Sequence, residues 1–101
     1  MSKEYEILYL PTAERDLYEI FDYIKKDSPA AASSMLERID AAVSHLSINP
    51  ELGVVPRDTR LKNLGYRMLI VEKYLVFYVV KEESIQIRRV IHGARRYEFL
   101  I

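Results

Sequence analysis

Three apolar runs between Tyr66 and His92 dominate the hydrophobic pattern of this chain. Each run is dense in valine, isoleucine, leucine and aromatic residues, which is typical of half-buried strands. The polar separators, Glu72-Lys73 and residues 81–84, have the length of hairpin connections. The pattern therefore predicts a three-stranded antiparallel meander, followed by a basic tail from His92 to Tyr97.

The middle run, residues 74–80, is apolar at every position. This pattern is typical of a central strand whose two faces are both covered, at least in part. A pair of helices can cover only one face, so we expect the other face to offer apolar and aromatic surface to a partner. Alternation in the last run predicts two opposite sets, Ile85, Ile87, Arg89 and Ile91 on one face, and Gln86, Arg88, Val90 and His92 on the other.

The first half of the chain changes to a helical period. A short strand at residues 5–10 ends before Pro11, and Thr12 is a plausible N-cap for the helix that follows. Tyr18 and Tyr23 lie off the centre of its apolar stripe, where they would flank the core or face a partner. The stripe itself consists of Ala13, Leu17, Ile20, Phe21 and Ile24.

A second helix begins at Ser28-Pro29, with serine as N-cap and proline at the first helical position. Its apolar residues recur at helical spacing as far as Asn49-Pro50. The few residues between the two helices predict an antiparallel hairpin. Residues 50–65 contain two prolines and two glycines without a clean period, so we expect a loop over most of this stretch.

These elements predict one α+β domain that covers residues 1–101. Its order is an N-terminal strand, an antiparallel helical hairpin and a three-stranded antiparallel meander with a short basic tail, with the helices packed on one face of the sheet. Without cysteine, the chain has no disulfide framework. We expect a cytoplasmic protein, because no apolar run approaches a membrane span and the N-terminus lacks a secretory apolar segment.

Charge divides along the chain although the net charge is zero. Residues 1–50 carry 5 Lys and Arg against 9 Asp and Glu, whereas residues 51–101 carry 10 against 6. An acidic helical half and a basic sheet half are suited to an anionic partner, and chance segregation in a small domain explains the split equally well. His45 and His92 have no ligand-spaced companions, and no phosphate-binding glycine loop is present, so we expect no metal and no cofactor.

In this order of elements, the chain resembles the RelE/ParE toxin superfamily of bacterial type II toxin–antitoxin systems. The similarity covers nearly the whole chain. It rests on Leu46-x-x-x-Pro50-x-x-Gly53 after the second helix, Tyr66-Arg67, Tyr74-Leu75-Val76-Phe77-Tyr78 and Arg89-Val90-Ile91-His92-Gly93-Ala94-Arg95.

The resemblance implies a small toxin that a cognate antitoxin holds inactive. Such antitoxins wrap the toxin with a flexible segment, and the complex is expected to bind operator DNA through the antitoxin. We expect the antitoxin to contact Tyr18, Tyr74, Val76 and Tyr78.

The superfamily contains two toxic mechanisms. RelE-like members are ribosome-dependent endoribonucleases that cut mRNA, and ParE-like members inhibit DNA gyrase without hydrolysis. A RelE-like reaction would need a proton donor or acceptor and cations around the phosphate. The catalytic candidates on this reading are His92, Arg67, Arg95 and Tyr97. Equally, His92 could be a strand-end histidine whose ring is hydrogen-bonded to hold the tail.

Departures from the RelE pattern favour the ParE-like branch. Leu75 stands where the ribonucleases place a functional arginine, and Arg67 alone remains of their lysine-rich run. The chain is also neutral, whereas ribosome binding draws on phosphate neutralisation. On this reading the cations bind a target and do no chemistry, and a third alternative is a non-toxic binding module. The target-binding candidates are Arg60, Lys62, Arg67, Arg88, Arg89, Arg95 and Arg96.

Two pairs of these target-binding candidates, Arg60 with Lys62 and Arg95 with Arg96, have structural alternatives. Arg60 and Lys62 lie in the loop before the meander, where charged residues are as often solvated connectors as binding groups. In the tail, Arg95 and Arg96 could pair with acidic residues of the helices, while Tyr97 and Phe99 pack as a lid. Exposed ion pairs contribute only ~0–1 kcal/mol, which would not explain so dense a cluster of cations.

Overall fold

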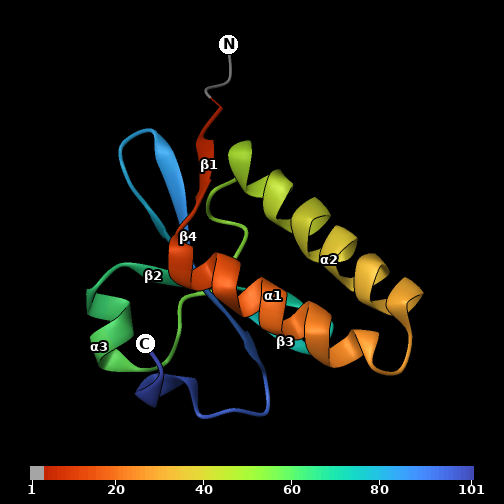
Figure 1. Ribbon diagram of the computed structural model, residues 1–101. Coiled ribbons are helices and arrows are strands. Elements are labelled where there is room, and N and C mark those ends of the chain that lie inside the picture. Colours follow the sequence, from red (N-terminus) through yellow and green to blue (C-terminus); the bar gives the residue numbers. More distant parts are fainter. Residues whose placement is uncertain (1–3) are drawn as a thin grey trace.

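A four-stranded sheet is the centre of the fold in the computed structural model, which describes residues 4–101 (Figure 1). The strand order is β1-β4-β3-β2, and β1 pairs parallel with β4 while the other pairs are antiparallel. The predicted α+β class and the meander are therefore confirmed. The element bounds are β1 Glu6–Tyr9, α1 Pro11–Lys25, α2 Pro29–Ser44, α3 Thr59–Asn63, β2 Tyr66–Val71, β3 Tyr74–Val80 and β4 Ser84–His92, with short 3-10 helices at His45–Ser47 and Tyr97–Phe99.

The two long helices form the predicted hairpin, but they begin differently. At α2, the Ser28 side chain accepts a hydrogen bond from the Ala31 N–H, which confirms the predicted N-cap. The predicted N-cap Thr12 is wrong, because α1 already begins at Pro11. The Thr12 hydroxyl instead donates to the carbonyl oxygen of Arg88 at 2.9 Å. No helix within residues 4–101 is long and apolar enough to cross a membrane.

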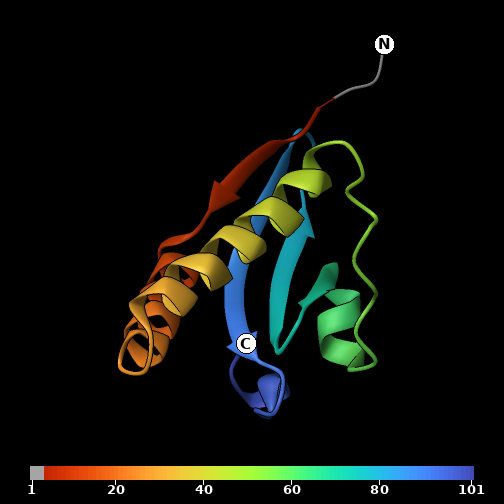
Figure 2. The ribbon, with the colours of Figure 1, turned by 90° about the vertical axis from the view of Figure 1, so that its right-hand side faces the viewer.

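Both long helices cover one face of the sheet, as Figures 1 and 2 show from two directions. Helix α1 contacts β4, and α2 contacts β2. The apolar stripe of each helix meets alternate residues of the strands, which produces the main core. Its buried residues are Ala13, Ile20, Ile39, Val43, Leu46, Leu69, Val71, Tyr74, Val76, Tyr78, Ile85, Ile87 and Val90.

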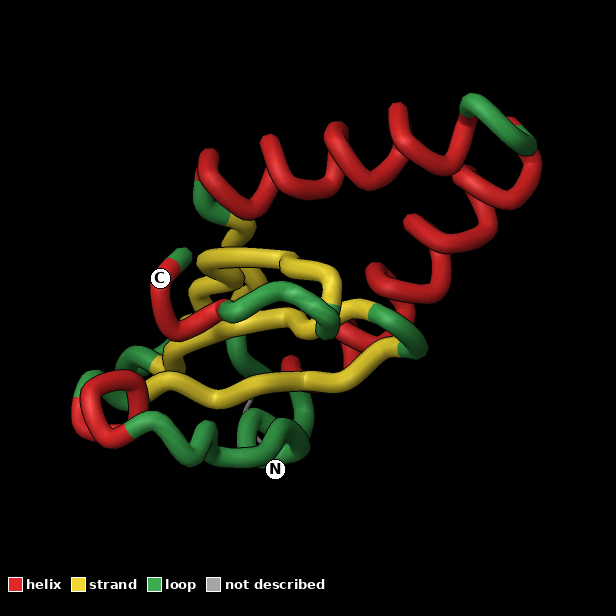
Figure 3. Tube along the Cα trace, turned by 90° about the horizontal axis from the view of Figure 1, so that it is seen from below, coloured by secondary structure: helices red, strands yellow, loops and turns green. Residues whose placement is uncertain are grey.

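The second face of the sheet is covered by the chain itself. Helix α3, which Figure 3 shows on the side of the strands away from the hairpin, contributes Leu61, and the C-terminal segment contributes Tyr97, Leu100 and Ile101. They pack against Tyr66, Phe77, Val79 and Ile91, with Met68 and Leu75 partly buried beside them. The expectation that this face offers apolar surface to a partner is wrong over the area under α3 and the tail, because the last residues are apolar and fold back.

The loop from residue 50 to 65 holds more regular structure than its composition predicts. Helix α3 forms where the Asp58 carboxylate accepts from the Leu61 N–H at 3.0 Å, capping a single helical stretch. Earlier in the loop, Val54 forms a bridge with Met68 at the outer edge of β2. The start of the loop is hydrogen-bonded to β3, since the Tyr78 hydroxyl donates to the Pro50 carbonyl and accepts from the Gly53 N–H.

A β-bulge in β4 changes which face its residues occupy. Phe77 pairs with Arg89 and Tyr78 pairs with Ile87, so Arg88 has no partner on β3. Beyond this extra residue the alternation reverses: Val90 lies in the main core and Ile91 in the second cluster. The predicted grouping of Ile91 with Ile85 and Ile87 is therefore wrong, because strict alternation does not survive a bulge.

Buried tyrosine hydroxyls make the fold sensitive to alkaline pH. Burial raises the pKa of Tyr78, and burial together with the Asp40 carboxylate raises the pKa of Tyr9. In the unfolded chain these phenols ionise near pH ~10, whereas the folded chain retains their protons. The stabilisation is therefore complete below pH ~10 and declines as pH rises above it, because the unfolded chain then loses protons that the folded chain retains.

We expect Tyr9→Phe to flatten this decline in urea unfolding measured between about pH 9 and about pH 11. The matched control is Tyr18→Phe, because the Tyr18 side chain is 73% exposed. An equal slope for the wild type and Tyr9→Phe would contradict the assignment.

Candidate functional site

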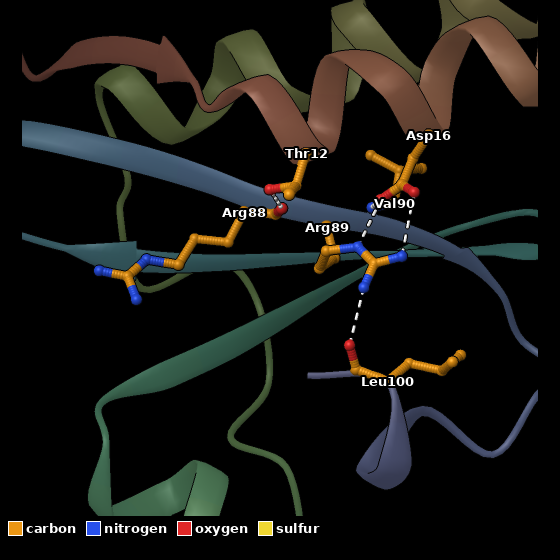
Figure 4. Close-up of polar contacts among 6 residues, drawn as sticks. All are labelled: Thr12, Asp16, Arg88, Arg89, Val90 and Leu100. Carbon is orange, nitrogen blue, oxygen red and sulfur yellow. Dashed lines mark hydrogen bonds and ion pairs between the residues drawn. The ribbon is translucent and has the colours of Figure 1, made fainter.

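The outer edge of β4 is shared between β1 and α1. Strand β1 pairs with β4 only as far as Ile87, where the Leu10 N–H donates to the Ile87 carbonyl. Past that point α1 binds the edge of β4 in place of β1. The Thr12 hydroxyl donates to the Arg88 carbonyl, and the Val90 N–H donates to the Asp16 carboxylate at 2.9 Å (Figure 4). Helix α1 thus positions the end of β4 and the tail that follows it.

Arg89 joins three parts of the molecule. Its guanidinium donates to both oxygens of the buried Asp16 carboxylate, with Nε 2.8 Å from Oδ2 and Nη2 3.1 Å from Oδ1. The third nitrogen, Nη1, donates to the Leu100 carbonyl at 2.7 Å (Figure 4). Hydrogen bonding to Asp16 raises the pKa of Arg89. All three nitrogens of the Arg89 guanidinium are engaged in holding α1, β4 and the tail together, so target binding by Arg89 stays a prediction.

Arg88, the bulge residue, is half-buried on the sheet. Its Nη2 donates to the Gln86 side chain at 2.8 Å, and its guanidinium lies 5.6 Å from the centre of the Tyr66 ring. The buried Nε has no hydrogen-bond partner among the described residues. Arg88 therefore presents only part of its charge to a macromolecular target.

The predicted loop cations differ in their availability. Arg60 donates from Nη2 to the carbonyl oxygens of Glu98 and Ile101, at 3.1 and 2.7 Å. Like Arg89, it holds the C-terminal segment against the sheet. Lys62 is exposed on α3, so its ammonium group remains accessible to a target.

Arg67 lies under the loop that precedes α3. Its Nη1 donates to the Gly53 carbonyl at 2.7 Å and to the Glu51 carbonyl at 3.3 Å. Its strand partner is Tyr78, whose hydroxyl binds the same loop. Arg67 consequently fixes the loop in this conformation.

His92 ends β4 and orders the turn into the tail. Its Nδ1 accepts from the Ala94 N–H at 3.1 Å, and its ring meets the Tyr74 ring edge-on with centroids 5.4 Å apart. This is the geometry of the structural alternative, a histidine hydrogen-bonded to hold the tail. The imidazole remains exposed on its other side.

A groove of about 450 Å³ lies between α1 and the end of β4. A second hollow of about 530 Å³ continues from it toward the tip of the helical hairpin, and the two share Tyr23, Tyr74 and His92. The floor is aromatic and aliphatic, Glu19 lies on one wall and Arg95 lies at the tail end. The first groove is lined by Asp16, Glu19, Ile20, Tyr23, Tyr74, Val90, Ile91, His92 and Arg95.

Only two of the four catalytic candidates share this groove, His92 and Arg95. Arg67 is opposite Tyr78, whereas His92 is opposite Tyr74, four residues away on β3. That separation is roughly 13 Å along the strand, with β3 between the two side chains. Tyr97 packs its ring against Phe77 at 5.0 Å, in the cluster on the opposite face of the sheet. The side chains of a cation-rich cleavage site are therefore dispersed.

The tail cations remain on the surface. Arg96 lies 4.7 Å over the Phe99 ring and 3.5 Å from the Glu98 carboxylate, so its pairing is within the tail and not with the helices. Phe99 is 74% exposed and does not form the lid considered from the sequence, whereas Tyr97 packs inward. Arg95, Arg96 and Phe99 form an exposed cationic and aromatic tail surface.

Three of the four residues expected to contact an antitoxin are buried. Val76 and Tyr78 are 0% exposed beneath the helices, so their placement on a partner-facing surface is wrong, whereas Tyr74, 6% exposed, contributes to the lining of the groove. Tyr18 is 73% exposed and is available, as is Tyr23 in the groove. Asp16, which binds Arg89 and the Val90 N–H, was not among the site residues predicted from the sequence. The available signal was a carboxylate four residues before Ile20 within an otherwise apolar stripe.

The strand order, helical hairpin and tail define the RelE/ParE class of toxin fold, and comparison with known proteins agrees. A solved structure of the chromosomal ParDE toxin–antitoxin system from P. aeruginosa is similar, with a TM-score of 0.75 and 23% identity, over 88% of this chain and 96% of that one. The toxin–antitoxin complex RelBE2 from Mycobacterium tuberculosis gives a TM-score of 0.64 and 24% identity, over 94% and 98% of the two chains.

Comparison with known sequences identifies the family within this class of fold. Toxin RelE2 of Caulobacter vibrioides is 33% identical over 91 residues, which is 89% of this chain and 97% of that protein. The family model for the ParE toxin of the type II toxin–antitoxin system parDE matches residues 7–97. The chain belongs to this ParE toxin family and is a toxin of a type II toxin–antitoxin system.

Proposed function

We propose that this toxin arrests growth by binding DNA gyrase and that it does not cleave RNA. The observation that carries the proposal is the dispersal of the cleavage candidates: Arg67 is bonded to loop carbonyls, Tyr97 is packed on Phe77, and only His92 and Arg95 share a groove. Stabilising a pentavalent phosphate needs several cations converging on one point. Recognition needs only an accessible surface, which the exposed tail residues Arg95, Arg96 and Phe99 offer.

The tail surface is the part of the molecule best suited to a protein target. Arginine and aromatic side chains carry much of the binding energy in protein interfaces. Arg95, Arg96 and Phe99 combine both types at an exposed position. Exposed Lys62 adds positive charge for an acidic target, whereas Arg60 and Arg89 support the tail from beneath.

The cognate antitoxin binds the helical side of the molecule on this proposal. Tyr18 and Tyr23 are exposed on α1, and Tyr23 opens onto the groove beside β4. Exposed aromatic rings are favoured anchors for a flexible segment that folds on binding. The complex would then reach operator DNA through the antitoxin.

Gyrase supercoiling in the presence of purified toxin tests the target. We expect inhibition by the wild type, and about tenfold weaker inhibition by the double variant Arg95→Ala/Arg96→Ala, because two interface charges are lost. The matched control is Lys26→Ala/Lys81→Ala, which removes two exposed cations elsewhere and should inhibit like the wild type. Unimpaired supercoiling with wild-type toxin would refute gyrase as the target.

A RelE-like ribonuclease is the second candidate, because His92 and Arg95 do lie in one groove and Toxin RelE2 is a relative. It predicts codon-positioned breaks in mRNA on translating ribosomes, lost in His92→Ala. Normal growth of cells at high expression without antitoxin would refute both toxic activities and leave a binding module.

A further inference from the structure

The ring of His92 is hydrogen-bonded through the nitrogen that a second proton would occupy. Its Nδ1 accepts from the Ala94 N–H at 3.1 Å, so the ring is neutral in this conformation and carries its hydrogen on Nε2. A protonated ring has a hydrogen on both nitrogens and accepts at neither. The hydrogen bond to Ala94 therefore exists only while His92 is uncharged.

Two main-chain hydrogen bonds accompany this one in the turn after β4. The Gly93 N–H donates to the Lys73 carbonyl at 2.7 Å, and the Arg95 N–H donates to the His92 carbonyl at 3.0 Å. Peptide groups do not titrate near neutral pH, so these two bonds are independent of pH there. Of the three bonds, the one to Ala94 is the one that protonation of a side chain removes.

The turn sets the position of the two tail arginines. Residues 94–96 are exposed, and the chain is attached to the sheet again at Tyr97, whose ring packs against Phe77. Arg95 and Arg96 thus lie between the turn and that attachment. A change in the turn therefore displaces both guanidinium groups, while the segment from Tyr97 onward stays packed on the second face of the sheet.

The groove offers the protonated ring a different partner. Glu19 and Arg95 line the groove together with His92. A positively charged ring that has lost Ala94 is attracted by the Glu19 carboxylate and repelled by the Arg95 guanidinium. Both forces direct the ring away from the tail and into the groove. Neutral and protonated His92 consequently favour two different conformations of the turn.

The other ionisable groups around the ring do not favour one sign of charge. Two carboxylates are already paired with arginines, and one further acid is matched by one lysine. Two phenols are uncharged near neutral pH, because a phenol ordinarily ionises near pH ~10. These groups are the pairs Asp16–Arg89 and Glu72–Arg38, the single charges Asp27 and Lys73, and the phenols of Tyr23 and Tyr74.

We propose that His92 is a pH-sensitive switch, whose neutral ring holds the turn that presents Arg95 and Arg96 and whose protonated ring releases it. A free imidazole takes up its second proton near pH ~6.5, so mild acidification operates the switch. Its effect on gyrase rests on the proposed function. There, acidification weakens target binding, because the two arginines lose their fixed position and must be ordered again on binding.

Nuclear magnetic resonance on the purified toxin tests the switch without a target. Spectra recorded from about pH 8 to about pH 5 follow the ring nitrogens of His92 and the Ala94 amide. We expect the hydrogen-exchange protection factor of Ala94 to fall at least about threefold, with the same midpoint as protonation of the ring. The Gly93 amide, bonded to the Lys73 carbonyl, should keep its protection. A ring that titrates without a change at Ala94, or that stays neutral throughout, would overturn the proposal.

An asparagine at position 92 provides the matched variant. In His92→Asn, Oδ1 takes the place of Nδ1 and accepts a hydrogen bond at every pH of the series, so Ala94 protection should not depend on pH. His45→Asn changes the second histidine, which is exposed at the end of α2, and should respond like the wild type. A response at Ala94 that survives in His92→Asn would assign it to another group and refute the switch.

Binding to purified gyrase at about pH 7.5 and at about pH 5.5 tests the consequence for the target. From the higher to the lower pH, we expect the dissociation constant of the wild type to rise about threefold more than that of His92→Asn. An equal rise in the two proteins would refute the effect on target binding. A wild-type toxin that bound gyrase at neither pH would refute the proposed target, and the resonance measurements would still decide the switch.

Discussion

Replacing Asp16 by alanine lowers the free energy of unfolding by about 3–5 kcal/mol. The carboxylate is 9% exposed, accepts two hydrogen bonds from Arg89 and accepts a third from the Val90 N–H. Its loss leaves a largely buried guanidinium without its counter-charge and a buried main-chain donor without an acceptor. Because Arg89 also holds Leu100, the loss should loosen the tail.

Urea unfolding of the purified variant measures this effect. Glu14→Ala is the matched control, since Glu14 is an exposed carboxylate in the first turn of the same helix and should cost about 0.5 kcal/mol or less. An Asp16→Ala variant as stable as Glu14→Ala would show that the junction of α1, β4 and tail does not depend on this ion pair.

Replacing Gly53 by alanine destabilises the fold by about 2–4 kcal/mol. An added Cβ would lie 2.7 Å from the Tyr78 hydroxyl oxygen and 3.0 Å from the Met68 carbonyl oxygen. Neither neighbour can withdraw cheaply, because Tyr78 is fully buried and Met68 is main chain in β2. The hydrogen bonds of the Tyr78 hydroxyl to Pro50 and Gly53 would be lost or strained.

A double-mutant cycle with Tyr78→Phe measures how much of the destabilisation by Gly53→Ala comes from the contact with the Tyr78 hydroxyl. Removing the hydroxyl alone should cost about 1–3 kcal/mol. It should make Gly53→Ala somewhat less costly, because the contact with the hydroxyl oxygen is gone while the 2.8 Å contact with Cε1 of the ring remains. Strict additivity of the two changes, measured by urea unfolding, would contradict the part of the clash assigned to the hydroxyl oxygen.

The sequence predicted the elements well because hydrophobic period and helix signals are local. The meander followed from alternation and polar separators, and the start of α2 followed from Ser28-Pro29. The bulge at Arg88 was not predicted, since it comes from the way β4 fits both β3 and the start of α1. The sequence does contain a trace of this change of phase: two adjacent charged residues, Arg88 and Arg89, are followed by two adjacent apolar residues, Val90 and Ile91.

The site was harder to predict because its side chains belong to distant parts of the chain. Asp16 and Arg89 are 73 residues apart in the sequence. Arg60 and Ile101, which are hydrogen-bonded, are 41 residues apart and are separated in the sequence by the whole meander. A cation in sequence looks the same whether it binds a target or a carbonyl of its own tail. The apolar ending of the tail, Phe99-Leu100-Ile101, was the signal that the second face of the sheet would be partly covered from within.

Mapping of cellular mRNA ends after toxin expression tests the central claim, that this toxin acts by binding and not by cleavage. We predict growth arrest with intact mRNA for the wild type, and arrest that persists in His92→Ala. Codon-positioned breaks that accompany the arrest and disappear in His92→Ala would contradict the claim.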